Sequence, residues 1–333
     1  MLNGFRDPLG FECPLPLGAM YYPLGFPMEL ASNHQAVLDL ARQRFECFRA
    51  RRESPKILVE VRVEADGDGS LPRPSFRGRA SLLSIYSDGR NFATCDLRGG
   101  YAFANVSECH LTSISGFAPP FLDAIVYSLL VYRRLTAIHA AAICRGGRGL
   151  LLCAPPGTGK SVMAYACAKR GWTFLSDDAV YLESTNSPAR VLGKPSGVRL
   201  KESASSLFPE LGDHPRTPDA HGEPHFELCS ADLSDLSTAE ECDAVRLVFL
   251  KRRHEEPVVC RPVSSDEAFR RLSADMPSYG EAVRTRHALA VRRLLQAPAC
   301  ELVYSEAVSA IPVLESLLAD RPESDRLAGK DSG

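Results

Sequence analysis

A glycine-rich loop and a pair of carboxylates lie within one stretch of the chain, LLLCAPPGTGKSVMAYACAKRGWTFLSDD, residues 150–178. The segment APPGTGKS, residues 154–161, fits the Walker A pattern with Ala154 in place of the first glycine. Glycines let such a loop form a nest of backbone N–H groups around phosphate oxygens, and a helix that follows directs its positive end at the same anion. The loop follows an apolar strand pattern and precedes a helical one, so it predicts a nucleoside triphosphate site.

The residues of this loop have expected roles at such a site. Lys160 would reach the β- and γ-phosphates, and Ser161 would ligate Mg²⁺. An ordinary glycine loop is the alternative, which the flanking strand and helix patterns disfavour. We expect ATP to contact the loop and the first turn of the helix: Pro155, Pro156, Gly157, Thr158, Gly159, Lys160, Ser161 and Val162.

The two carboxylates, Asp177 and Asp178, begin seventeen residues after Lys160. They could hold magnesium for the nucleotide, or one could take a proton from a hydroxyl that is about to be phosphorylated. Neighbouring side chains on a strand point to opposite faces, so one carboxylate can face the phosphates while the other does not, unless the strand ends between them. Adjacent aspartates after a strand are otherwise typical of a solvated turn. His139 lies on the strand expected to pair with the loop strand, where a core histidine is the default interpretation.

His139, the loop at 154–161, Lys-Arg-Gly at 169–171 and Ser-Asp-Asp at 176–178 together resemble the core of the bacterial HPr kinase/phosphorylase family. The stretch TAIHAAAICRGGRGLLLCAPPGTGKS is still more similar to HPr-kinase-like proteins of peptide-modification clusters, among them the kinases of lasso-peptide precursors. The resemblance covers about residues 136–183. It implies an α/β fold with a P-loop, HPr-kinase-like nucleotide-binding core beside a smaller N-terminal α+β domain.

This resemblance also implies an activity, the phosphorylation of a serine-type hydroxyl with ATP and Mg²⁺. The implied catalytic residues are Asp177 as proton acceptor, Lys160 at the phosphates and His139 lining the site. Asp178 would lie near the metal with Ser161. The acceptor would be a peptide or protein, with a small hydroxyl metabolite as the alternative. HPr kinases assemble as hexamers, which leaves a homo-oligomer open for this chain.

The segment after the carboxylates departs from the family, because the signature R-G-L-G-I-I is missing and residues 191–211 read VLGKPSGVRLKESASSLFPEL. Glu202 is a candidate substitute for a further metal-binding glutamate. Three cations here either neutralise phosphate or lie on a solvated surface: Lys194, Arg199 and Lys201. Three histidines follow without a zinc motif, so a polar surface loop is favoured over a metal site: His214, His221 and His225. Two other functions remain open, an ATP-binding regulatory module and a P-loop ATPase whose acceptor is water.

Composition limits the partners and the compartment of the 333-residue chain. Its net charge of −2 gives no electrostatic reason to expect nucleic acid or a membrane as partner. No signal peptide pattern is evident at the start, and eleven cysteines without a C-x-x-C pair predict reduced thiols in the cytoplasm.

Hydrophobic patterns predict an N-terminal domain over 1–130, a catalytic domain over 131–320 and a disordered tail over 321–333. We expect the first ~25 residues to be irregular because they are rich in proline and glycine. Periodicity predicts further elements in both domains. They are a helix in 33–52, strands at 56–67 and 98–106, a hairpin around Asp88-Gly89, single strands over 136–144 and 172–183, helices over 160–170, 266–276 and 280–297, and a final strand and helix over 299–320.

Overall fold

The computed structural model describes residues 14–65, 72–111, 118–183, 190–218, 223–229, 231–254, 256–274, 276 and 279–319. The predicted disordered tail and His221 lie outside these residues. The chain divides into two compact units, Met1–Arg133 and Arg134–Gly333. The boundary between them coincides with the end of the helix Ala124–Arg133 and lies three residues after the expected boundary at 130/131. Among the described helices none is long and apolar enough to cross a bilayer.

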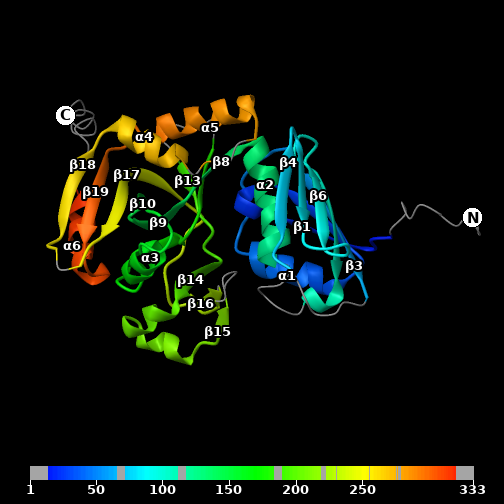
Figure 1. Ribbon diagram of the computed structural model, residues 1–333, viewed down its shortest axis with the longest axis horizontal. Coiled ribbons are helices and arrows are strands. Elements are labelled where there is room, and N and C mark those ends of the chain that lie inside the picture. Colours follow the sequence, from blue (N-terminus) through cyan, green and yellow to red (C-terminus); the bar gives the residue numbers. More distant parts are fainter. Residues whose placement is uncertain are drawn as a thin grey trace, which may run out of the picture. The chain divides into compact units, whose positions relative to one another are not determined.

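The N-terminal unit is a seven-stranded sheet in the order β1-β2-β3-β7-β6-β5-β4 (Figure 1). Along β3 buried residues alternate with partly exposed ones, so one sheet face lies in the core, as the apolar alternation predicts. Helix α1 contacts β1 and β2, and α2 contacts β6. The elements are β1 (Leu17–Tyr21), β2 (Met28–Ser32), α1 (Gln35–Phe45), β3 (Ile57–Glu64), β4 (Ser75–Arg79), β5 (Leu82–Tyr86), β6 (Phe92–Asp96), β7 (Tyr101–Ser107) and α2 (Ala124–Arg133).

The expectation of an irregular start is wrong for residues 17–21, which form β1. Proline and glycine do mark a tight turn, because Leu24 and Gly25 both have positive φ angles. On either side of that turn, however, β1 and β2 pair in antiparallel register. The Tyr21 hydroxyl then donates a hydrogen bond to the Leu38 carbonyl oxygen at 2.7 Å, which ties β1 to α1.

The C-terminal unit contains a nine-stranded mixed sheet in the order β11-β9-β10-β17-β13-β12-β8, with β19 also paired to β17 and β18 to β19. Strands β10, β17 and β19 are parallel to one another. The strands are β8 (Leu135–Ile138), β9 (Ala140–Arg145), β10 (Arg148–Cys153), β11 (Thr173–Ser176), β12 (Val180–Glu183), β13 (Arg190–Leu192), β17 (Glu241–Arg252), β18 (Val259–Val263) and β19 (Ala299–Tyr304); the helices are α3 (Lys160–Ala168), α4 (Ser265–Ala274), α5 (Glu281–Leu294) and α6 (Ala307–Ala319).

Helices cover both faces of this sheet, which makes the unit a three-layer α/β structure (Figure 1). Leu150 and Leu152 of β10 pack with α3 and α6 on one face. Leu151 and Cys153 point the other way, into the cluster formed by α4 and α5. Each such buried leucine stabilises the fold by about 1.5–3 kcal/mol. Burial on both faces explains why β10 is a continuous apolar run rather than an alternating one.

A separate three-stranded sheet, β14 (Gly197–Lys201), β16 (Pro224–Cys229) and β15 (Arg216–Pro218), packs against α3. Phe208 lies between the two short helical turns that connect β14 to β15. The centroid of its ring lies 4.8 Å from the centroid of the Tyr165 ring. The interpretation as a polar surface loop is wrong for residues 216–218, which form β15, whereas His214 lies outside any strand and the apolar run at 225–229 forms β16, as its pattern predicts. Phe226 and Leu228, two residues apart on β16, are almost fully buried. This alternation of apolar residues is a strand pattern, but it is short and is surrounded by prolines and charged residues.

Candidate functional site

Two strands of the C-terminal unit break at the same level of the sheet. The stretch around His139, expected as one strand, divides into β8 and β9 with His139 between them. The stretch with the carboxylates, also expected as one strand, divides into β11 and β12 at residues 177–179. Because β9 pairs with β11 whereas β8 pairs with β12, both segments change partners at this level. Both single-strand expectations are therefore wrong, and the breaks lie side by side.

The paired breaks bring His139 and Asp178 together. His139 Nε2 lies 3.1 Å from Asp178 Oδ1. Their side chains are 28% and 71% exposed, so the carboxylate faces solvent and the ring is partly enclosed. The hydrogen bond to His139 holds the pKa of Asp178 below its ordinary value. The Ser176 hydroxyl donates to the Ala179 carbonyl oxygen at 2.7 Å and closes the turn that carries both aspartates.

Asp177 has the opposite electrostatic environment. Its pKa is raised to about 6, mainly by burial and also by the neighbouring charge of Asp178, while the Arg199 hydrogen bond and the Lys194 charge oppose the shift. Its Oδ2 accepts a hydrogen bond from the backbone N–H of Arg199 at 2.8 Å. A carboxylate with this pKa is mostly ionised at neutral pH, yet it is a stronger base than an ordinary aspartate. The two adjacent carboxylates are thus suited to different tasks.

The glycine-rich loop joins the end of β10 to the start of α3. Gly157 and Gly159 have φ angles of 80° and 104°, in the left-handed region that favours glycine. At Gly157 no other atom lies within 4 Å of the position a Cβ would take, so the loop is open there. The buried Lys160 folds back and its Nζ donates to the Ala154 carbonyl oxygen at 2.7 Å. The Tyr304 hydroxyl holds the loop from β19 by donating to the Thr158 carbonyl oxygen at 2.9 Å.

Sheet topology places this loop and the two breaks at one edge. Strand β9 is antiparallel to both β10 and β11, so its first residue lies beside the last residue of β10, in the pair Ala140 and Cys153. The Lys160 charge is a minor cause of the lowered pKa of Asp178, after His139, burial and Lys194, which agrees with this placement. The candidate site therefore unites His139, Asp177, Asp178 and the loop that carries Lys160. The remaining residues expected to contact ATP, from Pro155 to Val162, all lie in the loop or the first turn of α3.

Lys194 and the backbone of Arg199 are parts of the site whose roles sequence patterns did not define. A Cβ at Gly193 would lie 2.5 Å from the Leu175 carbonyl oxygen, so only glycine lets this segment pass so close to the end of β11. That close approach brings the Lys194 charge within reach of both carboxylates, whose pKa values it lowers. In the sequence, the only sign of this role was a glycine followed by a lysine, Gly193 and Lys194, directly after a short strand. Such a pattern is too common to predict a site residue.

Other polar candidates form contacts away from the carboxylates. Glu202 lies 2.8 Å from the Arg216 guanidinium, and Lys201 lies 2.7 Å from Glu223, so the surface interpretation of this segment is favoured. His225 is buried with its Nε2 3.2 Å from the Thr217 hydroxyl. Within the described ranges no group of three or more histidine, cysteine, aspartate or glutamate side chains is placed to hold a metal ion.

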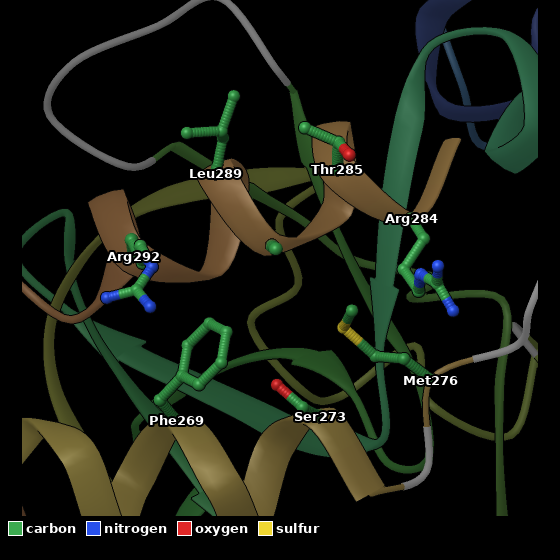
Figure 2. Close-up of a pocket in the computed structure, with 8 residues that line it drawn as sticks. Phe269, Ser273, Met276, Arg284, Thr285, Leu289 and Arg292 are labelled. Atoms are coloured by element: carbon green, nitrogen blue, oxygen red, sulfur yellow. The ribbon is translucent and has the colours of Figure 1, made fainter. Parts of the chain in front are cut away.

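A hollow of ≈ 520 Å³ lies elsewhere in the C-terminal unit, between α4 and α5 (Figure 2). The Arg292 guanidinium lies over the Phe269 ring, 4.5 Å from its centroid. Among the described residues the lining carries no carboxylate or histidine that could transfer a proton. It consists of Phe269, Ser273, Met276, Arg284, Thr285, Ala288, Leu289 and Arg292.

No family model and no curated protein matches the chain. Among solved structures the chain is similar to the Hpr(Ser) kinase/phosphatase from Coxiella burnetii, with 13% sequence identity and a TM-score of 0.30, over 58% of this chain and 98% of that chain. A likeness of this size does not establish a family, so the function must be argued from the site itself.

Proposed function

We propose that this chain is an ATP-dependent P-loop kinase that transfers the γ-phosphate to a serine-type hydroxyl of a peptide or protein. The observation that carries the proposal is the pair of adjacent carboxylates with opposite pKa shifts beside the glycine-rich loop. Asp177 has a pKa of about 6, whereas the pKa of Asp178 is lowered through His139. Neighbouring groups with divergent pKa values are the pattern by which acid–base roles are divided in an active site.

The residues present fit ATP and Mg²⁺. The loop is open at Gly157, and Lys160 supplies a buried ammonium group for the β- and γ-phosphates. Asp178, exposed and held ionised, and Ser161, in the first turn of α3, offer the oxygen ligands that Mg²⁺ prefers. The bound ion would neutralise charge on the phosphates. His139 orients Asp178 through the 3.1 Å contact.

The proposed reaction moves one proton and one phosphoryl group. The acceptor hydroxyl gives its proton to the Asp177 carboxylate as its oxygen forms a bond to the γ-phosphorus. The bond between the γ-phosphorus and the bridging oxygen breaks, and ADP leaves with that electron pair. Lys160 neutralises the charge that develops, and positioning supplies most of the remaining rate.

The acceptor and setting belong to the same proposal. A peptide or protein is the proposed acceptor, which the resemblance to HPr-kinase-like proteins supports, with a small hydroxyl metabolite as the alternative. The cytoplasm supplies ATP, and all cysteines within the described ranges are free thiols. We also propose that the chain forms a homo-oligomer, and a sedimentation experiment would test this oligomeric state.

The test compares wild type with Asp177→Asn, using ATP labelled at the γ-phosphate, Mg²⁺ and a panel of serine-bearing peptides. Asparagine keeps an oxygen that can accept the Arg199 N–H, so ATP affinity should change by less than about 2-fold while transfer falls by about 10²–10⁴-fold. Equal ATP hydrolysis by both proteins without an acceptor would instead indicate an ATPase. Equal binding with no turnover on any acceptor would favour the regulatory module.

A further inference from the structure

The sheet of the N-terminal unit ends in a strand with a free edge, β4. It is the last strand in the sheet order, and among the residues that the structure describes it pairs with β5 alone. All five of its residues are exposed, and its register with β5 has no bulge. Natural proteins commonly blunt such an edge with a proline, a bulge, a covering loop or charged side chains, because unpaired backbone groups invite another strand. Residues 75–79 contain no proline.

The hairpin turn defines which backbone groups point to the free edge. Only Ala80 and Ser81 separate Arg79 from Leu82, and these two flanking residues face each other in register. In a two-residue hairpin the flanking pair exchanges hydrogen bonds, and every second pair along the ladder repeats this. The backbone N–H and C=O groups of Phe76 and Gly78 therefore point away from β5. They are available to a further strand.

Side chains around this edge combine exposed apolar surface with unpaired positive charge. Phe76, Leu82 and Tyr86 are 55%, 54% and 53% exposed, and all three lie on the β4–β5 hairpin. Arg77 and Arg79 lie two residues apart and so share one face, separated by about 6.8 Å. Neither arginine has an ion-pair partner among the residues that the structure describes.

We propose that β4 binds an extended, acidic segment of a peptide partner by strand addition. The partner's backbone would pair with Phe76 and Gly78, and acidic side chains at alternate positions would face Arg77 and Arg79. A second copy of this chain fits less well, because antiparallel pairing of two β4 strands would set arginine against arginine. Binding of the peptide at β4 does not depend on the proposed kinase function. Only the further step, that the bound peptide is the phosphate acceptor, rests on that function.

The experiment measures peptide binding directly, without ATP, so its failure is distinguishable from failure of the kinase proposal. The probe is a fluorescein-labelled octapeptide of alternating valine and glutamate, followed by fluorescence anisotropy. Two altered probes carry lysine in place of glutamate or N-methyl groups on alternate backbone nitrogens. The full-length variants are the double charge reversal Arg77→Glu with Arg79→Glu, and Gly78→Pro, which removes a free-edge N–H without touching the β5 ladder. Arg42→Glu on α1 is the matched control.

We expect wild type and Arg42→Glu to bind the glutamate probe equally. The charge reversal and Gly78→Pro should each weaken binding at least 10-fold while the midpoint of thermal unfolding stays within about 3 °C. The lysine and N-methylated probes should bind wild type at least 10-fold more weakly. No binding to wild type would overturn the proposal, as would full affinity for the N-methylated probe, since attraction by charge alone needs no backbone N–H. A wild-type dimer that the charge reversal dissociates would assign β4 to self-association instead.

Discussion

The two large sheets of this protein differ in the continuity of their strands. In the seven-stranded sheet every pairing runs without a register shift, and burial alternates regularly along β3. In the nine-stranded sheet the register shifts between Gly149 and Leu150 and again between Phe174 and Ser176. In continuous strands the backbone N–H and C=O groups form hydrogen bonds with neighbouring strands. An interrupted strand leaves some of these groups without a strand partner, and side chains must then supply their hydrogen bonds. The shift between Phe174 and Ser176 lies directly before the strand break that carries Asp177 and Asp178, whereas the shift after Gly149 lies at the other end of β10.

The polar residues at these interruptions have structural and chemical roles together. Ser176 satisfies the Ala179 carbonyl oxygen, and Asp177 satisfies the Arg199 N–H. The same carboxylate of Asp177 is left with a raised pKa, chiefly because partial burial penalises its charged form. The unfavourable energy in this site comes from a buried carboxylate, whereas the described strain in the continuous sheet is confined to turn backbone such as Ala80. The predictions below test that difference.

The largest effect is expected for Lys160→Ala, in the loop between β10 and α3. Removal of the buried ammonium group leaves the phosphate charge without its main partner. Transfer should fall by about 10³-fold or more, with weaker ATP binding. Lys169→Ala, at the exposed pair with Glu210, is the control and should retain activity. Comparable activity in both variants would contradict the assignment of the loop.

Asp177 should determine the lower limb of the pH–rate profile. Its carboxylate must be ionised to accept a proton, so the transfer rate should rise with pH up to about 6 and level above that value. An Asp178→Asn variant should shift this midpoint to lower pH, because it removes the neighbouring charge that raises the pKa of Asp177, and it should also lose Mg²⁺ affinity. A midpoint near pH 4 in wild type would show that burial does not raise the pKa of Asp177.

Asp177→Asn should also stabilise the fold at neutral pH. The folded-state pKa of Asp177 lies above its ordinary value of 3.8, so ionisation of this group destabilises the folded protein as pH rises through about 6. The variant should gain about 1–3 kcal/mol in unfolding free energy above pH 6, and the gain should vanish below about pH 4. Denaturant unfolding at several pH values measures this, and a pH-independent difference would argue against it.

His139→Ala should act through Asp178 rather than on the phosphates. Without the 3.1 Å contact the carboxylate loses its orientation, so the Mg²⁺ concentration needed for half-maximal transfer should rise about 10-fold. At saturating Mg²⁺ the rate should return to within about 3-fold of wild type. His139→Gln, which can still hydrogen-bond, should recover part of the Mg²⁺ affinity. An unchanged Mg²⁺ dependence in the alanine variant would show that His139 has no positioning role.

The smallest effect is expected in the continuous sheet. Ala80, in the β4–β5 turn, has a φ of 52°, which costs a residue with a Cβ about 1 kcal/mol. Ala80→Gly should therefore stabilise the protein by about 0.5–1 kcal/mol in chemical denaturation, with phosphoryl transfer unchanged. Destabilisation by this change would indicate that the turn is not strained.

Most local elements were predictable because they depend on neighbouring residues. The hairpin around Asp88 and the helices of the C-terminal unit follow from turn residues and apolar periodicity. The missed strands β1 and β15 are short, and each pairs with the strand that follows it closely in the chain, β2 and β16. β15 has no apolar run of its own, and the apolar residues of β1 stand among prolines and glycines, which favour the irregular interpretation.

The sequence alone determined the loop at 154–161, because glycines at defined spacing before a lysine leave few other conformations. It also indicated that a histidine and two aspartates belong near that loop. Only the tertiary structure decided that β8 and β9 part at His139 and that β11 and β12 part at Asp177 and Asp178. Those breaks depend on which strands pair across the sheet, a choice made by contacts between residues far apart in the chain. The pKa of Asp177 was decided the same way, because burial and a backbone N–H from Arg199 are properties of the packed molecule.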